Sequence, residues 1–333
     1  MPQNLAFVRQ GFLFALMVVT LAWTPVPPAA AASLQTWHHG IVSAKSDAGF
    51  AMMAADGGFA AQQGLKIETL QLKGDALLLK ALIAGEIDSY EGSPGAPIIA
   101  ASHGADIKLV GCYWPGLTYG LFSKPDVTLQ TLAGKSFGIS SPGALPDLLA
   151  RAVLEKYNVP TTATRFVVMG SDAERFQALT AGVIDIAAAS VEFTPLAQAR
   201  GLKLLVHAPE VVPNYLRFCT YLTSKTIAKR HDAAVRFLAA EITAFRHALA
   251  DRAAEIALTQ RVIHTKPDDP RPAFIFDEVT RTHAIVPDMP IPMAKLAWMQ
   301  DLLVKTGNLA KPIDLNRLVD PSVRVAALKR LGS

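Results

Sequence analysis

One eight-residue motif occurs twice in this chain of 333 residues, and the repeat constrains the fold more than any other feature. The copies are residues 81–88 and 178–185, which share six of eight residues and lie 97 positions apart. An alternating run at residues 66–72 precedes the first copy, and the run at residues 164–169 precedes the second. Two copies in matching surroundings predict two lobes of the same topology.

Each repeat unit is typical of a strand, a helix and a second strand. Asp75 and Asp172 are placed to cap the helices, because a short carboxylate accepts hydrogen bonds from free amides at a helix start. Gly85 and Gly182 can take the left-handed conformation that ends a helix. Strands that alternate with helices form right-handed βαβ units, so each lobe should be an α/β structure with a mostly parallel sheet flanked by helices.

The remaining pattern extends this plan. We expect each lobe to open with a strand and a helix, at residues 34–41 and 48–61 in lobe one and at residues 135–139 and 145–157 in lobe two, with Ser46-Asp47 capping the first helix. After Tyr215 apolar residues step by three and four, which indicates a helical tail, with further helices at residues 273–284 and 292–306. The tail should pack on lobe one.

The first 32 residues indicate an exported protein. Arg9 is the sole charged residue before Lys45, and an apolar run of 13 residues and an Ala-rich stretch follow it. This is the layout of a signal peptide cleaved near Ala32. The alternative is an uncleaved anchor, but a bilayer-spanning helix takes about 20 residues. We expect a periplasmic mature protein.

Composition excludes several classes. Apolar residues make up 51% and charged residues 18%, which is typical of a globular protein. The net charge of +4 comes without a basic run, so no nucleic-acid partner is expected. Two cysteines do not suffice for a Cys-rich metal site, and His38 and His39 face opposite sides of a strand. We expect no metal and no cofactor.

Four segments carry a family resemblance: residues 54–65, the repeated motif, residues 132–138 and residues 199–205. In their order and spacing the chain resembles the nitrate/sulfonate/taurine and thiamine-pyrimidine family of ABC-transporter substrate-binding proteins, which have the type II periplasmic binding fold. The resemblance implies two lobes joined by two hinge segments, near residues 114–120 and 216–222. Lobe one would hold residues 33–117 and 218–333, and lobe two residues 118–217.

The resemblance also implies a function. The chain would be a monomer without enzymatic activity that binds a small-molecule ligand between the lobes and delivers it to an ABC permease and ATPase complex. An enzyme on the same fold, acting on a small acid or a pyrimidine, and a periplasmic ligand sensor are the alternatives. The candidate ligands are sulfonates, carboxylates, nitrate and pyrimidines, and of these classes we favour an organic anion.

Ligands of open α/β sheets bind at the carboxyl ends of the strands, which gives the candidate site. Ser140 and Ser141 precede a helix and form an anion site or cap that helix. Trp114 stacks on a ligand or packs in the hinge. Glu91 and Glu192 end corresponding strands and accept bonds from an amine, or are solvated acids. The candidate ligand-binding residues are His39, Ser43, Ser46, Glu91, Ser93, Trp114, Ser140, Ser141, Gly143 and Glu192.

The sequence leaves open whether Cys112 and Cys219 form a disulfide. The resemblance implies that the strand returning from lobe two enters the lobe-one sheet antiparallel, beside the strand at residues 107–113. Neighbouring residues there lie within disulfide range. The alternative is two buried free thiols.

Overall fold

The computed structural model describes Met1 and residues 33–333, so the predicted signal peptide lies outside the described residues. Residues 34–333 form one compact unit. None of the helices within residues 33–333 combines the length and the apolarity needed to cross a membrane.

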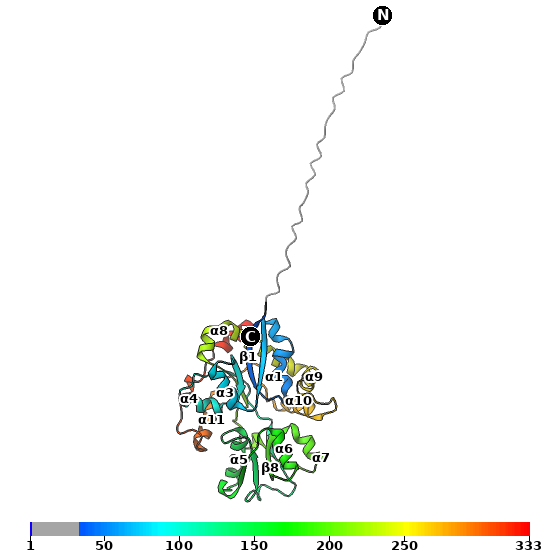
Figure 1. Ribbon diagram of the computed structural model, residues 1–333, viewed down its shortest axis with the longest axis vertical. Helices are drawn as coiled ribbons and strands as arrows, with labels where there is room; N and C mark the ends of the chain where they lie inside the picture. Colours follow the sequence, from blue (N-terminus) through cyan, green and yellow to red (C-terminus); the bar gives the residue numbers. More distant parts are fainter. Residues whose placement is uncertain (2–32) are drawn as a thin grey trace. The chain divides into compact units, whose positions relative to one another are not determined.

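Two five-stranded sheets organise this unit, one in each lobe (Figure 1). Lobe one has the strand order β2-β1-β3-β10-β4, and lobe two has the order β7-β6-β8-β5-β9. The strands are β1 (Gln35–Val42), β2 (Leu65–Leu72), β3 (Ser89–Gly92), β4 (Lys108–Trp114), β5 (Tyr119–Ser123), β6 (Ser136–Ile139), β7 (Arg165–Val168), β8 (Ile186–Ser190), β9 (Lys203–His207) and β10 (Phe218–Leu222).

The two sheets correspond strand for strand. In the spatial order given above, the first three strands of each sheet run parallel to one another. The fourth strand pairs antiparallel with both of its neighbours. That fourth strand is β10 in lobe one and β5 in lobe two, and each of them comes directly after a crossing between the lobes. The predicted pair of similar, mostly parallel α/β lobes is confirmed.

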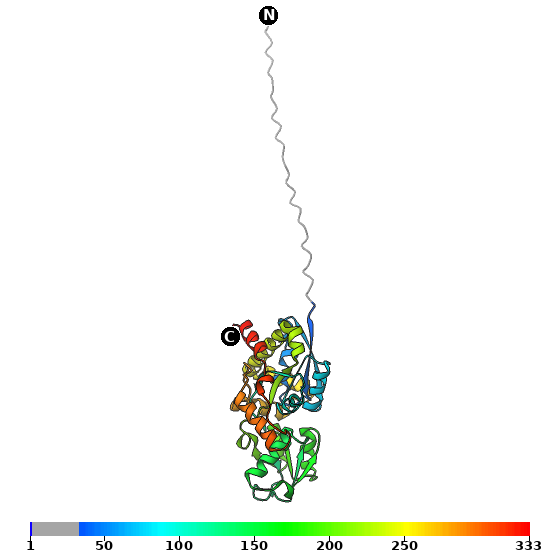
Figure 2. The same ribbon diagram turned by 90° about the vertical axis from the view of Figure 1, so that its left-hand side faces the viewer.

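Helices flank both sheets, and the C-terminal helices pack mainly on lobe one (Figures 1 and 2). The long helix α8 contacts α1, α12 and β1, and α11 contacts α4. The helices are α1 (Ala48–Asp56), α2 (Phe59–Gln62), α3 (Asp75–Ala84), α4 (Gly95–Ser102), α5 (Leu145–Lys156), α6 (Asp172–Thr180), α7 (Thr194–Ala199), α8 (Ser224–Ala250), α9 (Arg252–Val262), α10 (Pro270–Thr282), α11 (Met293–Lys305) and α12 (Ser322–Arg330).

The repeated motif forms the end of α3 and the turn that leads into β3, and in lobe two the end of α6 and the turn that leads into β8. Gly85 and Gly182 adopt φ of 79° and 76°, so both helices end in left-handed glycine. The predicted Asp caps are wrong. Gly74 precedes α3 without a side-chain cap, and Ser171 caps α6 by accepting a hydrogen bond from the Glu174 amide. Both aspartates lie one position further on, in the first helical turn.

The single helix expected at residues 48–61 is two helices. The chain leaves α1 at Gly57, and Gly58 adopts φ of 86° before α2 begins. The apolar period continues across the break, so the pattern of apolar residues does not reveal it. The prediction that Ser46 and Asp47 cap the first helix is also wrong, since no side-chain hydrogen bond caps α1.

Candidate functional site

Charged side chains from both lobes meet where the strands end. The loop between β1 and α1 supplies Lys45 and Asp47 from lobe one. Lys45 Nζ donates to Asp172 Oδ2 of lobe two at 3.0 Å, and Asp47 forms an ion pair with Arg217. Arg175, three residues beyond Asp172 on α6, also pairs with that aspartate. We call these five residues the interlobe charge cluster.

Asp172 is the centre of the cluster. Tyr119 donates its hydroxyl to Oδ1 at 2.7 Å, and the Ser190 amide lies 3.4 Å from Oδ2. Burial alone would raise the pKa of the carboxyl, but Lys45 and Arg175 outweigh burial and hold it well below its usual range. Asp172 is therefore a buried carboxylate that stays ionised and joins the two lobes.

Arg217 anchors the other half of the cluster. Its side chain is 3% exposed, and its guanidinium lies 4.2 Å from the Trp114 ring centroid. It also donates to Thr118 Oγ1 on the first crossing segment. A planar guanidinium suits stacking and ion pairing together, which keeps this charge satisfied although it is buried.

Two glutamates border the cluster with perturbed acidity. Burial raises the pKa of Glu91 to about 7, although Tyr113 donates its hydroxyl to Oε2 and lowers it in part. Burial likewise raises the pKa of Glu192 to about 7, with Asp47 adding to the shift. Glu192 Oε2 has no hydrogen-bond partner among the described residues. Both side chains are buried, not solvated as the simpler interpretation held.

A small cavity lies beside the cluster. It has a volume of about 20 Å³ and is lined by residues of β1, the β1–α1 loop, α1, Glu91, Tyr113, Trp114 and Phe218. This is room for about one water molecule. A larger cavity of about 250 Å³ lies between the first crossing segment, residues 207–213 and the end of α10. Among its lining residues, Arg281 forms an ion pair with Glu278, and His207 Nε2 lies 3.3 Å from Oε1 of the same carboxylate.

Three of the predicted ligand-binding residues, Ser43, Glu91 and Trp114, line the small cavity. Ser46 is buried in the adjacent loop, and its hydroxyl has no partner among the described residues. Ser93 Oγ lies 2.8 Å from the Tyr215 hydroxyl, on the second crossing segment. The structure therefore brings part of the predicted set together around the cluster.

His39 lies elsewhere, in the interior of lobe one. Its Nδ1 is 2.8 Å from Ser89 Oγ, and its ring packs on Phe237 of α8 with the ring centroids 5.0 Å apart. Burial lowers its pKa to about 3, so the ring is neutral. His39 is not among the residues that line either cavity.

The loop before α5 holds Ser140, Ser141 and Gly143. The interpretation of Ser141 as a helix cap is not confirmed, because Ala144 occupies the cap position without a side-chain hydrogen bond. Gly143 adopts φ of 76°, and its amide donates to Asp147 Oδ2 at 2.9 Å. Ser141 is exposed and Ser140 is half-buried.

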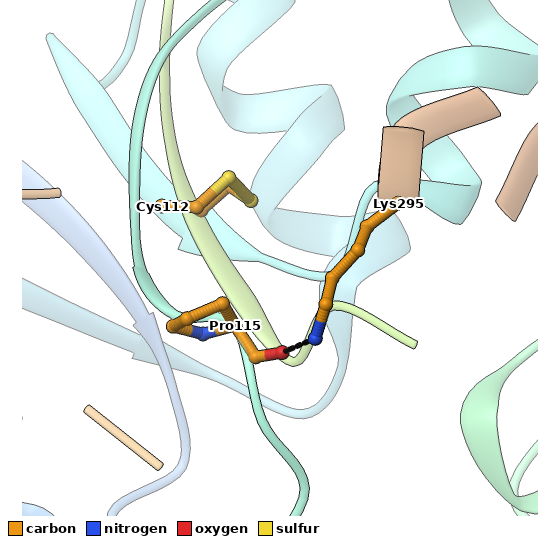
Figure 3. The surroundings of a disulfide bond; sticks show 4 residues. Cys112, Pro115 and Lys295 are labelled. Carbon is orange, nitrogen blue, oxygen red and sulfur yellow. Dashed lines mark hydrogen bonds between the residues drawn. A yellow bond between two sulfur atoms is a disulfide. The ribbon is translucent and has the colours of Figure 1, made fainter. Parts of the chain in front are cut away.

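Both crossing segments are tied together at the lobe-one side (Figure 3). Cys112 and Cys219 form a disulfide, where β10 runs antiparallel beside β4 as the resemblance implied. Lys295 of α11 donates to the Pro115 carbonyl at 2.7 Å and lies 3.4 Å from the Pro213 carbonyl. The lobe-one ends of the crossings are thus held by one covalent bond and one lysine.

Arg175 did not emerge from the sequence as a site residue. Its guanidinium also donates to the Ala188 carbonyl at 2.7 Å and the Met169 carbonyl at 3.0 Å, inside lobe two. The one available signal is its position three residues after Asp172, a spacing that lets two helical side chains meet.

A protein-family model described as NMT1/THI5 like matches residues 46–254, which is more than half of the chain. The chain belongs to the NMT1/THI5-like family. No curated protein matches the sequence.

Solved structures show that the NMT1/THI5-like chain has the two-lobed fold of periplasmic binding proteins. The ligand-binding component of an ABC-type import system from Staphylococcus aureus has a TM-score of 0.71 at 19% identity, covering 88% of this chain and 99% of the other. The aliphatic sulphonate binding protein SsuA from Escherichia coli has a TM-score of 0.70 at 18% identity, covering 86% and 92%. The desulfurization enzyme DSZB has a TM-score of 0.66 at 17% identity, covering 89% and 99%.

Proposed function

We propose that this NMT1/THI5-like protein captures a small organic solute between its lobes and delivers it to an ABC importer. The observation that carries the proposal is the interlobe charge cluster, in which Lys45 of lobe one meets Asp172 of lobe two at the strand ends. A solute held there contacts both lobes at once, so its binding is coupled to their closure. The ABC import system and SsuA structures support the proposal through their common fold.

The movement we propose is a hinge closure. Residues 33–117 with 218–333 form one lobe and residues 118–217 the other, and the crossing segments absorb the change. The disulfide and Lys295 hold the lobe-one ends of the crossings. Bending then falls on the few residues between those ties and lobe two. The small cavity would widen to the size of a solute only when the lobes move apart.

The solute that we favour is an organic anion. Lys45 lines the small cavity, and Arg217 pairs with Asp47, which lines it too. The loop with Ser140, Ser141 and Gly143 adds hydroxyl and amide donors from lobe two. Ser43, Ser46, Glu91, Ser93, Trp114 and Glu192 complete the proposed binding set, whereas His39 would act only by supporting lobe one.

Export to the periplasm is the second part of the proposal. The N-terminal pattern supports it, and so does the Cys112–Cys219 disulfide, because such bonds persist in oxidising compartments. A permease and ATPase complex would be the partner there.

The enzyme alternative rests on the similarity to DSZB, of which a mutant with serine in place of a cysteine was solved in complex with biphenyl-2-sulfinic acid. Both cysteines of the present chain are joined in the disulfide. Neither is available as a thiolate, the form in which a cysteine acts as a nucleophile. This supports a binding protein over an enzyme that uses cysteine.

The test is a thermal-shift screen of sulfonates, carboxylates, nitrate and pyrimidines, followed by mass spectrometry of the recovered compound. A solute at one hundred times its dissociation constant stabilises the protein by about 2.7 kcal/mol. We expect stabilisation by a small acid that is recovered unchanged. A chemically altered compound would identify an enzyme. Failure of every compound to shift the melting temperature would contradict solute binding of these classes.

A further inference from the structure

The cations of the interlobe charge cluster are already engaged. Lys45 pairs with Asp172, and Arg217 pairs with Asp47. Arg175 also pairs with Asp172 and donates to three carbonyl groups of lobe two. An anion that enters this site therefore finds no cation among these three that lacks a partner.

The two bordering glutamates decide the sign of the net charge. The cluster holds three cations and two carboxylates, which leaves a net charge of +1 when both glutamates are protonated. With Glu91 and Glu192 both ionised, the same set carries a net charge of −1. An anion is attracted in the first case and repelled in the second.

Glu192 is the glutamate with spare hydrogen-bonding capacity. It is 2% exposed, and its Oε2 has no partner within residues 33–333. It lies in the short turn Val191–Phe193 directly after β8, the strand that corresponds to β3 in lobe one. A protonated carboxyl donates one O–H bond, whereas an ionised carboxylate can only accept.

The charged groups that face Glu192 come from three elements. They are Asp47 and Lys45 of the β1–α1 loop, Asp172 of α6, and Arg271 of α10. Asp47 and Asp172 disfavour ionisation of Glu192, while Lys45 and Arg271 favour it. Lys45 is already paired with Asp172, so it stabilises the ionised form of Glu192 less than an unpaired lysine would.

We propose that Glu192 binds the solute as a neutral acid, so that the protein takes up a proton together with its anionic ligand. The proton resides on the carboxyl of Glu192, which donates its O–H to an oxygen of the anion. This inference rests on the proposed function and names the form of the site that accepts an anion. The pKa of about 7, raised mainly by burial, places the proton exchange near neutrality.

The experiment measures the dissociation constants of ethanesulfonate and benzoate from pH 6 to pH 9, in bis-Tris and Tris buffers that contain no competing sulfonate. For the wild-type protein we expect the affinity to fall by about tenfold per pH unit above pH 7, the slope for one linked proton. Glu192→Gln carries a permanent N–H donor. We expect this variant to bind more tightly than wild type at pH 8.5 and to lose the tenfold step per pH unit, keeping only the weaker dependence that comes from the charge of Glu91.

Glu255→Gln is the matched control. Glu255 is also buried with a raised pKa, of about 8, and its Oε2 also has no partner in the described chain. It lies on α9 against the start of α1, where Asp47 also acts on its carboxyl, but it is not itself among the residues that line the small cavity. We expect this variant to keep the pH dependence of the wild type. Melting curves at pH 6 establish that both variants are folded.

The outcomes separate this inference from the proposed function. An anion that binds the wild type with a flat profile, or that binds Glu192→Gln with an unchanged slope, overturns proton uptake by Glu192 and leaves solute binding intact. Loss of the pH dependence in Glu255→Gln as well also overturns the assignment to Glu192. Failure of both anions to bind at pH 6, with binding of a pyrimidine instead, overturns this inference and the anionic solute together.

Discussion

The disulfide should be a main source of stability, because the loop that it closes contains all of lobe two. Cys112 and Cys219 are 107 positions apart, and the loop holds the entire second sheet. In the chain-entropy account, a loop of this length restricts the unfolded chain by about 5 kcal/mol. Both residues are fully buried, so the double variant Cys112→Ala/Cys219→Ala also loses some packing. We expect it to be less stable by about 3–5 kcal/mol.

The assay is equilibrium unfolding in urea, followed by circular dichroism and tryptophan fluorescence. With a slope of about 3 kcal/mol per molar urea, the midpoint should fall by about 1 M or more. The midpoint of wild-type protein under reducing conditions should fall toward that of the double variant, which has lost the packing of the two sulfurs as well, and reductant should leave the double variant unchanged. Alkylation under denaturing conditions should label no cysteine in unreduced wild type. A loss of stability below about 1 kcal/mol would refute the loop-entropy reasoning, and two labelled cysteines would refute the bond.

Two further predictions concern the buried charges. The pKa values of Glu91 and Glu192 rise from 4.5 to about 7 on folding, so their contribution to stability is fully present below about pH 4.5 and is lost as the pH rises through 7. Urea unfolding should therefore show stability falling by a few kcal/mol from pH 5 to pH 8, and a profile that rises over this range would contradict the assignment. Asp172→Ala should cost about 3–5 kcal/mol because it leaves Arg175 buried without its carboxylate, whereas Glu155→Ala, at an exposed ion pair, should cost less than about 1 kcal/mol in the same assay. Equal losses in the two variants would show that burial does not govern these pairs.

The sequence predicted the architecture well because the repeated motif is visible in short stretches of sequence and implies two lobes of the same topology. Residues 81–88 and 178–185 lead into β3 and β8, which occupy corresponding places in the two sheets. Their glycines end the helices as expected, since a left-handed residue is required there whatever surrounds it. The break between α1 and α2 escaped because adjacent glycines interrupt the helix without interrupting its apolar period.

The site was predicted less completely, because its ion pairs join side chains that are close in space but far apart in the sequence. Asp47 and Asp172 occupy positions that are typical of helix caps. Local patterns cannot reveal that Arg217 pairs with Asp47 and Lys45 with Asp172, because the partners in each pair are far apart in the sequence. Glu91 and Glu192 were found from their expected places at the ends of corresponding strands, although Glu91 lies within β3 and Glu192 in the turn after β8. Their burial, which sets their acidity, follows from tertiary packing alone.

The strand order also dictates when each lobe can be completed during synthesis. All five strands of the second sheet lie between Tyr119 and His207, so this sheet can assemble as soon as that stretch of chain is available. In the first sheet, the strand next to β4 is β10, which is made about one hundred residues later. Until residues 218–222 arrive, β4 has no sheet partner and β3 presents an open edge. The lobe that starts first must therefore finish last, and a chain that stops before β10 leaves unpaired strand edges of the kind that promote aggregation.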